Sequence, residues 1–469
     1  MPDRRWVIAL AVWVALVVGG WVGWKLWLDR PRRIWWHRAS PTEKTVLFVV
    51  MDTVRADRLS ACGHDRPTSP TLQRLVEQGA SLSCAAAAPG SWTYPSHASY
   101  FTGLMPPEHG AHFVPAGEEI RQLVIRPLAP ELETLAEHFA AQGYQTIGRS
   151  GNPVLQPESG LTQGFTSWDA AGQFGGWYGD ALIRKLERAL QQAVPEDGPL
   201  FLFVNIADAH DPWDGVPAGL DWIEPREDDL LVYFQTDGEG TIMPDGPWHR
   251  YVRGEMDQAE AEALRVRVAD LYDHAVFEAD RTLGAVIQTV KQHGWADGGL
   301  RIVVVSDHGE YHGEHGLLRH GRYLWQPNNG VFLLAHDTDG TVPPLPSPIS
   351  AIEAHQLVMT GTRPDPVPPV LAAAWPDRTW MAQSGGAVGG STSAALWTGT
   401  DKLVWQDNRW MSFDLTADPG ELNPQAVSED DPRRAVLGPF VDQVQASADR
   451  ALDTDPALIE ALRAAGYVE

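Results

Sequence analysis

The amino-acid sequence predicts an α/β fold built on a doubly wound, mostly parallel sheet. Three short apolar, β-branched runs are typical of strands buried on both faces, because apolar and polar residues do not alternate in them. These runs are TVLFVVM (45–51), LFLFVNIA (200–207) and RIVVVS (301–306). Helical patterns lie between them at 69–79, 129–143 and 273–294. The chain has 469 residues, 43% of them hydrophobic, and can bury the large core that this fold needs.

The chain is expected to begin with a membrane anchor. The segment from Trp6 to Trp24 has 19 residues without a charge, and a helix of that length roughly spans a hydrocarbon core. No small-residue cleavage site follows, so an uncleaved anchor is favoured over a removed signal peptide. Residues 1–43 are therefore assigned to an anchor and a basic linker. The basic residues after the segment outnumber the two arginines before it, which by the positive-inside rule would hold the main domain in the cytoplasm.

The main domain is expected over residues 44–390, with two excursions from the alternation of strands and helices. An acidic, aromatic insert covers about 214–262, and a Pro/Gly-rich stretch runs from about 337 to 390. Residues 391–469 are assigned to a small C-terminal subdomain. Within it, 391–415 has the pattern of a pair of antiparallel strands and 455–467 that of a closing helix.

Net charge and cysteine content restrict the function. The chain has 36 basic and 61 acidic residues, and its formal charge of −25 would repel a phosphate backbone, so we expect no nucleic-acid partner. Its two cysteines, Cys62 and Cys84, are too few for a disulfide framework or a cysteine zinc cluster. A single bridge between them is possible, but burial as two small hydrophobic side chains is the favoured interpretation.

Polar residues gather directly after the predicted strands, where ligands bind in open α/β sheets. Asp52 follows the first run, Asp208 and His210 follow the second, and Asp307 and His308 follow the third. An isolated aspartate at a strand end is usually a cap or turn residue. If the strands are neighbours, however, Asp52, Asp307 and His308 can reach one cation with two hard oxygens and one nitrogen. Such a set favours Mn²⁺, Mg²⁺ or Zn²⁺ over a pure calcium site.

More histidines follow in DHGEYHGEHGLLRHG, residues 307–321. His312 and His315 are equally well explained as ordinary polar loop residues. His320 lies twelve residues after His308, which is far enough for a loop to return over the site. We expect His320 to place a cationic donor on a bound oxyanion.

The segment GSWTYPSHASYFTG (90–103) contains a candidate nucleophile. Pro95 stands where a first helical residue belongs, so the Thr93 hydroxyl would lie at the positive end of a helix. That position suits a helix cap. It also suits an alkoxide, because exposed backbone N–H groups and a divalent cation both stabilise an ionised hydroxyl.

Taken in order, these motifs resemble the sulfatase family of the alkaline phosphatase superfamily, from about residue 44 to the C-terminus. VLFVVMDTVRADRLS resembles the family's opening strand and helix, TYPSHASYFTG its nucleophile segment, and VVVSDHGEYHGEHG its second metal-ligand pair. ADAHDPW and HGRYLW resemble two segments with basic substrate contacts, and SFDLTADPGELNP resembles the C-terminal signature. The resemblance implies an alkaline-phosphatase-like sandwich and one divalent cation, Mn²⁺, Mg²⁺, Zn²⁺ or Ca²⁺. It also implies metal ligands at Asp52, Thr93, Asp307 and His308, and catalytic roles for Thr93, His210 and His320.

Several residues depart from the family's pattern. The sulfatase nucleophile is a cysteine or serine, converted to formylglycine within Cys/Ser-x-Pro-x-Arg, whereas this chain has Thr93 and His97 in the places of the nucleophile and the arginine. Threonine cannot become formylglycine. Asn152, in GRSGNP, stands near the place of a family lysine, and the glutamates usual after the HGRYLW-like segment are absent. His97 and Asn152 are therefore candidate substrate-binding residues.

The nucleophile determines the expected chemistry. A formylglycine hydrate releases sulfate by elimination, whereas a threonine ester must be cleaved by attack at its central atom, which is easier at phosphorus. We expect a metal-dependent hydrolase of sulfate or phosphate esters, with phosphoryl chemistry favoured. The alternatives are a transferase of phosphoglycerol or phosphoethanolamine onto an envelope glycan or lipid, and a non-catalytic sulfatase-like envelope protein. The resemblance places the domain in the periplasm and leaves the oligomeric state open.

Overall fold

The computed structural model of the protein describes residues 44–116, 122–173, 176–213, 216, 220–226, 235–236, 242–243, 246–321, 323–340, 342–374 and 392–452. The predicted anchor (1–43) and the predicted closing helix (455–467) lie outside the described residues. Among the helices that are described, none combines the length and the apolar character needed to cross a membrane.

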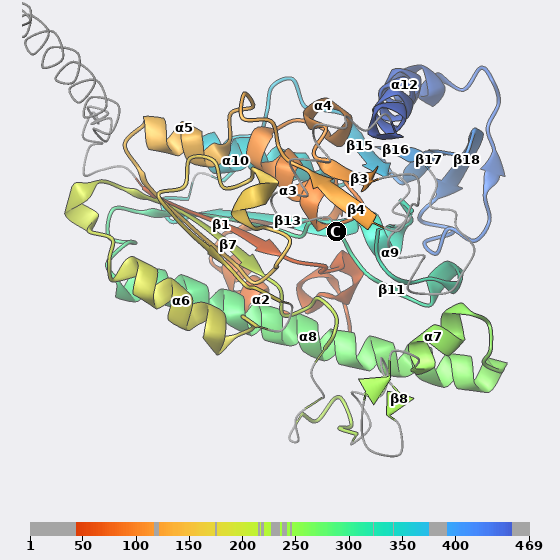
Figure 1. Ribbon diagram of the computed structural model, residues 1–469, viewed down its shortest axis with the longest axis horizontal. Helices are drawn as coiled ribbons and strands as arrows, with labels where there is room; N and C mark the ends of the chain where they lie inside the picture. Colours follow the sequence, from red (N-terminus) through yellow and green to blue (C-terminus); the bar gives the residue numbers. More distant parts are fainter. Residues whose placement is uncertain are drawn as a thin grey trace, which may run out of the picture.

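An eight-stranded sheet forms the centre of the main domain (Figure 1). In spatial order its strands are β14 (Ile349–Ser350), β2 (Ser81–Ala87), β13 (Gly330–Asp337), β10 (Leu300–Val305), β1 (Thr45–Met51), β7 (Leu200–Ile206), β5 (Gln145–Ser150) and β6 (Ser167–Ala170). Strand β13 is antiparallel to both neighbours, and the other neighbouring pairs are parallel. The predicted mostly parallel sheet is confirmed, and the three predicted strands are adjacent at its centre.

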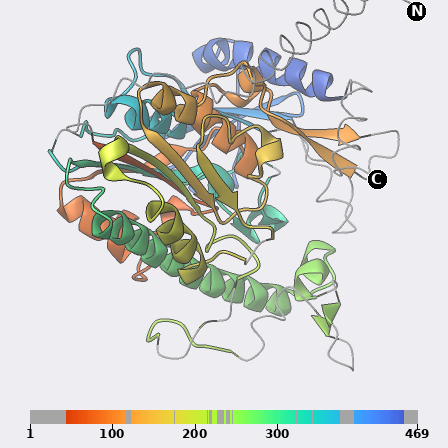
Figure 2. The ribbon, with the colours of Figure 1, turned by 60° about the vertical axis from the view of Figure 1, so that its left-hand side comes forward.

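Helices cover both faces of this sheet (Figures 1 and 2). One face carries α2 (Pro70–Glu77), α6 (Asp180–Leu190) and α8 (Gln258–Gln292), and the other carries α3 (Thr93–Thr102), α5 (Leu135–Ala141) and α10 (Ala354–Thr360). Strand β1 explains why the predicted strands are apolar throughout. Leu47 and Val49 join the core on the α8 side, whereas Val46 and Phe48 join the core on the α3 side.

Helix α8 is longer than the pattern at 273–294 predicts, because it begins at Gln258. The carboxylate of Asp257 accepts hydrogen bonds from the backbone N–H groups of Ala259 and Glu260, at 2.9 Å each, and the Glu260 side chain reaches back to the N–H of Asp257. This reciprocal capping starts the helix inside the predicted insert. The last residues of the insert are therefore helical.

A second sheet of five antiparallel strands follows, as predicted for the C-terminal part. Its strands are β15 (Val370–Ala374), β16 (Ser393–Thr398), β17 (Asp401–Gln406), β18 (Arg409–Asp414) and β19 (Gln425–Ala426), and α12 (Pro432–Leu452) packs against it. It begins earlier than residue 391, because β15 pairs with β16 from within the Pro/Gly-rich stretch. The predicted pair of strands at 391–415 is in fact three strands.

The remaining described elements are short. Three are helices: α4 (Pro106–His109), α7 (Pro247–Val252) and α9 (Gln326–Asn329). Six strands form antiparallel pairs: β3 (His112–Ala116) with β4 (Gln122–Arg126), β8 (Gln235–Thr236) with β9 (Ile242–Met243), and β11 (Tyr311–His312) with β12 (Leu318–Arg319). The 3₁₀ turns are η1 (Ala56–Arg58), η2 (Ser60–Cys62), η3 (Pro157–Ser159), η4 (Pro195–Asp197), η6 (Glu314–Gly316) and η7 (Ala351–Glu353).

The two cysteines form a disulfide, so the favoured interpretation of two buried free thiols is wrong. Cys62 ends η2 and Cys84 lies in the middle of β2, and their Cα atoms are 5.6 Å apart. Cys84 is exposed and Cys62 is half-buried, which does not fit burial as small hydrophobic residues. The sequence separation of 22 residues gave no indication that the turn after β1 would lie beside β2.

Candidate active site

The structure brings together Asp52, Asp307 and His308, the predicted metal ligands. Asp52 directly follows β1, and Asp307 and His308 follow the adjacent strand β10, so that all three lie at the carboxyl edge of the sheet. One ligand atom from each of them lies within 4.8 Å of the others, and all three side chains are completely buried. We call these three residues the first cluster.

Each carboxylate of the first cluster has one oxygen held by the protein and one without a partner. Asp52 Oδ2 accepts hydrogen bonds from the side-chain amides of Asn152 (2.8 Å) and Asn205 (3.0 Å). Asp307 Oδ1 accepts from the backbone N–H groups of Thr53 (3.1 Å) and His308 (3.0 Å). Asp52 Oδ1 and Asp307 Oδ2 are buried and have no hydrogen-bond partner among the described residues.

His308 adds a nitrogen to these two oxygens. Its Nδ1 donates to the Gly309 carbonyl at 3.0 Å, which assigns the lone pair to Nε2. Nε2 lies 3.7 Å from Asp52 Oδ1 and 3.5 Å from Asp307 Oδ2. Burial, with help from nearby His320, lowers the pKa of His308 well below its ordinary value, so the imidazole is neutral.

The charges of the first cluster are unbalanced without a cation. Burial opposes ionisation of Asp52, but His210, His308 and His97 outweigh it and lower the pKa of this carboxyl. Burial and the charge of Asp52 raise the pKa of Asp307 well above its ordinary range. Because buried acceptor atoms are costly when unpaired, the two free oxygens and Nε2 of His308 fit a divalent cation.

Thr93 points its hydroxyl at the first cluster. Its Oγ1 lies 3.2 Å from Nε2 of His308 and accepts a hydrogen bond of 3.3 Å from the Asn152 amide. Thr93 is the first residue of α3 and Trp92 is the cap residue, so the cap interpretation of Thr93 is wrong. Pro95 is accordingly the third helical residue and not the first. The Thr93 side chain is 2% exposed, at the positive end of the helix.

The two candidate substrate-binding residues lie beside Thr93. Asn152 bridges Thr93 and Asp52 through its amide, as described above. His97 is completely buried: its Nδ1 donates to the Thr93 carbonyl at 2.8 Å, and its Nε2 accepts from Asn205 at 3.3 Å. Burial lowers the pKa of His97 to about 4, so a neutral side chain stands at the place of the family's arginine.

His210 and His320 form a second group next to His308. The ring centroid of His320 lies 4.3 Å from that of His308 and 5.1 Å from that of His210. Burial and His210 lower the pKa of His320 to about 3. His320 is therefore neutral at physiological pH, and the expected cationic donor is wrong.

Two acidic residues accompany these histidines. Burial opposes ionisation of Asp211, but nearby Arg319, with its Nε 3.0 Å from Asp211 Oδ2, outweighs it and lowers the pKa of this carboxyl. Glu310 lies within 3.2 Å of Nδ1 of His320. Burial and the charge of Asp211 raise the pKa of Glu310 well above its ordinary range.

Three polar residues from the same motifs lie elsewhere. His312 packs against Tyr272, with ring centroids 4.4 Å apart, and His315 stacks on Trp325. Asp208 accepts hydrogen bonds of 2.9 Å from the Gly179 N–H and the Thr282 hydroxyl. These contacts explain the three residues as parts of the fold.

Two local features position the first cluster. Thr53 adopts φ 62°, a left-handed conformation that is uncommon for a β-branched residue, and aims its N–H at Asp307. Gly309 allows a close approach to α9, because a Cβ there would lie 2.1 Å from the Pro327 carbonyl oxygen. From α9, Asn328 donates to the Ser91 carbonyl (3.1 Å) and Asn329 to the Gly90 carbonyl (2.9 Å), which fixes the chain before Thr93.

Sequence reasoning missed Asn205, Asp211 and Glu310. Asn205 had a visible signal, because it is a polar residue in the otherwise apolar run LFLFVNIA. Asp211 and Glu310 lie within quoted motifs, next to the residues that were singled out. Their place in the sequence, next to candidate site residues, could have drawn attention to Asp211 and Glu310. Their burial beside histidines, however, is visible only in the structure.

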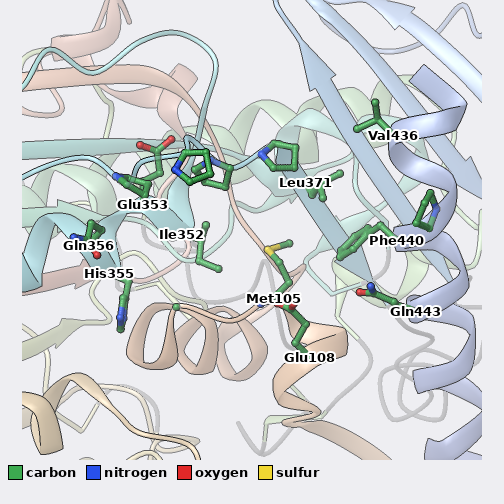
Figure 3. Close-up of a pocket in the computed structure, with 16 residues that line it drawn as sticks. Met105, Glu108, Ile352, Glu353, His355, Gln356, Leu371, Val436, Phe440 and Gln443 are labelled. Atoms are coloured by element: carbon green, nitrogen blue, oxygen red, sulfur yellow. Dashed lines mark hydrogen bonds between the residues drawn. The ribbon is translucent and has the colours of Figure 1, made fainter. Parts of the chain in front are cut away.

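A cavity of about 480 Å³ lies away from both groups (Figure 3). It is bounded by α10, by α12 and by residues near α4, and its lining includes Ile352, Leu371, Phe440 and several prolines. None of the candidate site residues lines it. Its lining comes from both the main domain and the C-terminal part, and the ionisable residues in it are Glu108, Glu353 and His355.

The α/β sheet, with carboxylates, an imidazole and a hydroxyl at its carboxyl edge, defines a sulfatase-like ester hydrolase. The family model for sulfatases matches residues 44–353, more than half of the chain, and the chain therefore belongs to the sulfatase family. No curated protein sequence matches it.

Solved structures share this fold. One is BT4656 in complex with its substrate D-glucosamine-2-N,6-O-disulfate, with a TM-score of 0.61, 15% identity, and coverage of 88% of this chain and 99% of that chain. Another is the phosphonate monoester hydrolase of Agrobacterium radiobacter, with a TM-score of 0.58, 17% identity, and coverage of 87% and 96%. A third is the phosphonate monoester hydrolase SpPMH from Silicibacter pomeroyi, with a TM-score of 0.55, 16% identity, and coverage of 88% and 96%. At identities of 15–17%, the likeness to these structures shows a shared fold and nothing about the reaction of this chain.

Proposed function

We propose that this protein hydrolyses phosphate, phosphonate or sulfate esters with Thr93 as the nucleophile, and that phosphorus esters are the better substrates. The observation that carries the proposal is the position of the Thr93 hydroxyl, 3.2 Å from Nε2 of His308 and beside two buried carboxylate oxygens without partners. Sulfatases and phosphonate monoester hydrolases of the same fold act on related esters. The chain keeps the fold and replaces the nucleophile.

Asp52, Asp307 and His308 would hold one divalent cation, with Thr93 as a further ligand. When bound, this cation stabilises the ionised form of a hydroxyl and neutralises charge on the ester oxygens. The amide of Asn152 supports the same hydroxyl and also holds Asp52 in place. His97 would position Thr93 indirectly, because its ring N–H donates to the Thr93 carbonyl at the start of the helix.

The reaction takes two displacements. Thr93 Oγ1 attacks the phosphorus or sulfur atom, the bond to the ester oxygen breaks, and the alcohol leaves with the proton that the hydroxyl gave up. Water then attacks the same central atom, which releases the inorganic acid or phosphonate and restores the hydroxyl. His210 and His320 lie beside His308 on the side where the ester oxygens would be bound.

The preference for phosphorus follows from the nucleophile. A threonine ester cannot release its acid by elimination to an aldehyde, so the second step must be attack at the central atom. That attack is easier at phosphorus than at sulfur. The intermediate should therefore turn over as a phosphothreonine or phosphonate ester, and a sulfated Thr93 should persist longer.

The test is a panel of nitrophenyl phosphate, phosphodiester, phosphonate and sulfate esters with the full-length protein and two variants. We expect Thr93→Ala to lose at least about 10³-fold in kcat, whereas Thr93→Ser keeps measurable turnover. Mass spectrometry after a rapid quench should find the transferred phosphoryl or phosphonyl group on Thr93. Equal rates for wild type and Thr93→Ala across the panel would instead indicate the non-catalytic alternative.

An added alcohol separates hydrolysis from transfer. In the presence of glycerol or ethanolamine, a hydrolase releases mainly the free acid, because water competes well for the intermediate. A dominant alcohol adduct would replace the hydrolase by the transferase. Both outcomes leave the role of Thr93 intact.

We further propose that the catalytic domain lies outside the cytoplasm, in the periplasm. The Cys62–Cys84 disulfide supports this side, because such bonds form in oxidising compartments and are rare in the cytosol. The charges that flank the predicted anchor favour the cytoplasmic side instead, so the disulfide and the flanking charges point to opposite sides. Proteolysis of intact spheroplasts tests the assignment, and complete protection of the domain would overturn it.

A further inference from the structure

An ion pair between Arg319 and Asp211 joins the two loops that carry the site histidines. Nε of Arg319 lies 3.0 Å from Oδ2 of Asp211. Asp211 directly follows His210 in the loop after β7, and Arg319 directly precedes His320 at the end of β12. Each partner of the ion pair is therefore the chain neighbour of one histidine, and the pair bears on the distance between the two rings.

Asp211 transmits this restraint to His210. The side chain of Asp211 is buried, and its backbone carbonyl accepts a hydrogen bond of 2.6 Å from Nδ1 of His210. Oδ1 of the same residue lies 3.5 Å from that nitrogen. The carbonyl and the carboxylate of Asp211 thus face one edge of the His210 ring. The orientation of the ring therefore depends on where Asp211 is held.

The backbone of Arg319 is left-handed, with φ 66°. In a regular strand successive side chains point to opposite faces, so Arg319 and His320 would point apart if β12 continued. In the structure Arg319 contacts Asp211, and the ring centroid of His320 lies 5.1 Å from that of His210, so both side chains reach the same loop. Glycine adopts a left-handed backbone without steric cost, whereas arginine is strained there. Such strain points to a task for the side chain.

Helix α7, which lies in the predicted insert, covers the guanidinium. Cζ of Arg319 lies 5.0 Å from the ring centroid of Trp248, within the range of a cation–π interaction. Trp248 is itself buried, so its ring shields one face of the guanidinium from water. From the same helix, the Tyr251 hydroxyl donates to the Gly313 carbonyl at 3.0 Å, at the turn between β11 and β12. Helix α7 thus holds this hairpin both at its turn and at its end.

We propose that Arg319 is a positioning residue, whose ion pair with Asp211 sets the spacing of the two site histidines. The inference deepens the proposed function, on which it rests for the roles of His210 and His320. Both rings can serve one ester only while their spacing is kept, because small displacements of reacting groups are costly in rate. The inference also gives the insert a part in the site, since Trp248 holds the guanidinium in place.

The alternative is an ion pair that only stabilises the fold. The backbone argues against it, because a glycine at position 319 would remove the strain. Burial argues against it as well: the Asp211 side chain is 4% exposed and that of Arg319 23%, and the desolvation of a buried carboxylate offsets much of the attraction. Strain and desolvation both cost stability. The geometry that the pair imposes on the histidines explains it better.

The test removes the ion pair without leaving a buried charge. In the double variant Arg319→Gly, Asp211→Asn of the full-length protein, glycine suits the backbone and the amide is neutral, so the melting temperature should stay close to that of the wild type. On the phosphorus ester that the wild type hydrolyses fastest, we expect kcat to fall about 10²-fold and KM to change less than about threefold. Arg319→Lys keeps the charge without the planar fork and should lose less of kcat.

A second measurement reports the spacing itself and needs no turnover. In deuterated protein with protonated histidine, the NMR cross-peak between the ring protons of His210 and His320 depends on the distance between the rings, whose centroids lie 5.1 Å apart. The His210→Gln and His320→Gln variants assign it. We expect the cross-peak to weaken in the double variant. The matched control is Arg250→Gln on α7, which breaks a surface pair with Glu260 and should leave the cross-peak and kcat unchanged.

The outcomes separate this inference from the proposed function. A weaker cross-peak together with a lower kcat supports the positioning role. An unchanged cross-peak in the folded double variant overturns it, and so does an unchanged kcat in an enzyme that is active as wild type. If the wild type hydrolyses no ester of the panel, the proposed function fails, and the cross-peak alone decides whether the ion pair sets the spacing. Circular dichroism checks folding, and if the double variant unfolds, the same readouts of Arg319→Lys decide.

Discussion

Asp52 performs two tasks with one carboxylate. Its Oδ2 is held by two amides, from Asn152 and Asn205, while Oδ1 is left without a partner and faces His308. Two hydrogen bonds on one oxygen orient the side chain, so the other oxygen needs little reorganisation to bind a cation. Asn205 contributes to this orientation without being a candidate ligand.

Asn205→Leu tests that contribution. The substitution removes the hydrogen bond to Asp52 and the one to His97, so we expect the Kd of the cation at the first cluster to rise about 10–100-fold. Isothermal titration with Mn²⁺ or Zn²⁺ measures it. The matched control is Asn423→Ala, at an exposed position in the C-terminal part. An unchanged Kd in Asn205→Leu would show that the hydrogen bond from Asn152 is enough to orient Asp52.

The positions of the candidate ligands could be predicted from the sequence, but their charge states could not. Asp52, Asp307 and His308 follow strand-like runs, and strand ends meet at one edge of a parallel sheet. The charge of His320 depends on burial beside two other imidazoles, which no local pattern reveals. The role of Asn205 depends on β7 lying next to β1.

Among the elements, α2 is capped by another helix. The backbone N–H groups of Thr71 (2.6 Å) and Leu72 (3.0 Å) donate to the carboxylate of Asp280 on α8. Ser69, the residue at the cap position, makes no side-chain cap hydrogen bond. One carboxylate thus satisfies two buried N–H groups of the first helical turn, which have no partner within α2, and fastens α2 to the longest helix of the described chain.

Burial raises the pKa of Asp280 to about 6, and this predicts a pH dependence of stability. An acid with a raised folded pKa binds its proton more strongly in the folded state, so stability falls as pH rises from about 4 to 6. The difference between this pKa and that of an ordinary aspartate limits the loss of folding stability over this pH range to about 3 kcal/mol.

Asp280→Asn should remove this dependence, because the amide does not ionise. Relative to wild type, the variant should gain stability between pH 4 and pH 6, as followed by melting temperatures in a pH series. Asp65→Asn, on an exposed side chain, controls for the charge change. Parallel curves for wild type and Asp280→Asn would contradict the prediction.

The disulfide joins η2 to β2 and should stabilise both. Closing a loop of 22 residues is expected to contribute about 2–4 kcal/mol. The Cys62→Ser, Cys84→Ser double variant should therefore melt several degrees below the wild type. A reducing agent should lower the melting temperature of the wild type to that of the variant and leave the variant unchanged.

Element patterns were predicted best where core packing dominates. The runs that became β1, β7 and β10 are apolar because both faces are covered by helices. That the three strands are neighbours was a condition of the predicted metal site, and only the structure shows it. The start of α8 was missed because its capping residues, Asp257 and Glu260, stand in a segment whose acidic, aromatic composition suggested a surface insert. Strand β15 was missed because its pairing partner lies about twenty residues away.

At the scale of the whole molecule, the C-terminal sheet supports the active site. Lys402 on β17 is completely buried, pairs with Glu421 at 2.6 Å and also donates to the Leu324 carbonyl. Glu421 accepts from the backbone N–H of Gln326, at the start of α9. The two asparagines of α9 in turn hold the chain before Thr93. The C-terminal sheet is thus connected through a buried ion pair to the segment that precedes Thr93.

Lys402→Met should cost about 3–5 kcal/mol, because it leaves the Glu421 carboxylate buried without its counter-ion. The double variant Lys402→Met, Glu421→Gln should recover much of the loss, since no charge is then left unpaired. Urea unfolding measures both. Lys185→Met breaks a surface pair with Asp169 as the control and should cost less than about 1 kcal/mol.

Thr93 also bears on how an active enzyme would be formed in the cell. A formylglycine nucleophile has to be made from a cysteine or serine after synthesis, whereas the proposed threonine nucleophile needs no such conversion. If Thr93 has the proposed role, folding and metal uptake alone would complete the active site. Specific activity should then be the same from any expression host, whether or not that host makes the modifying enzyme.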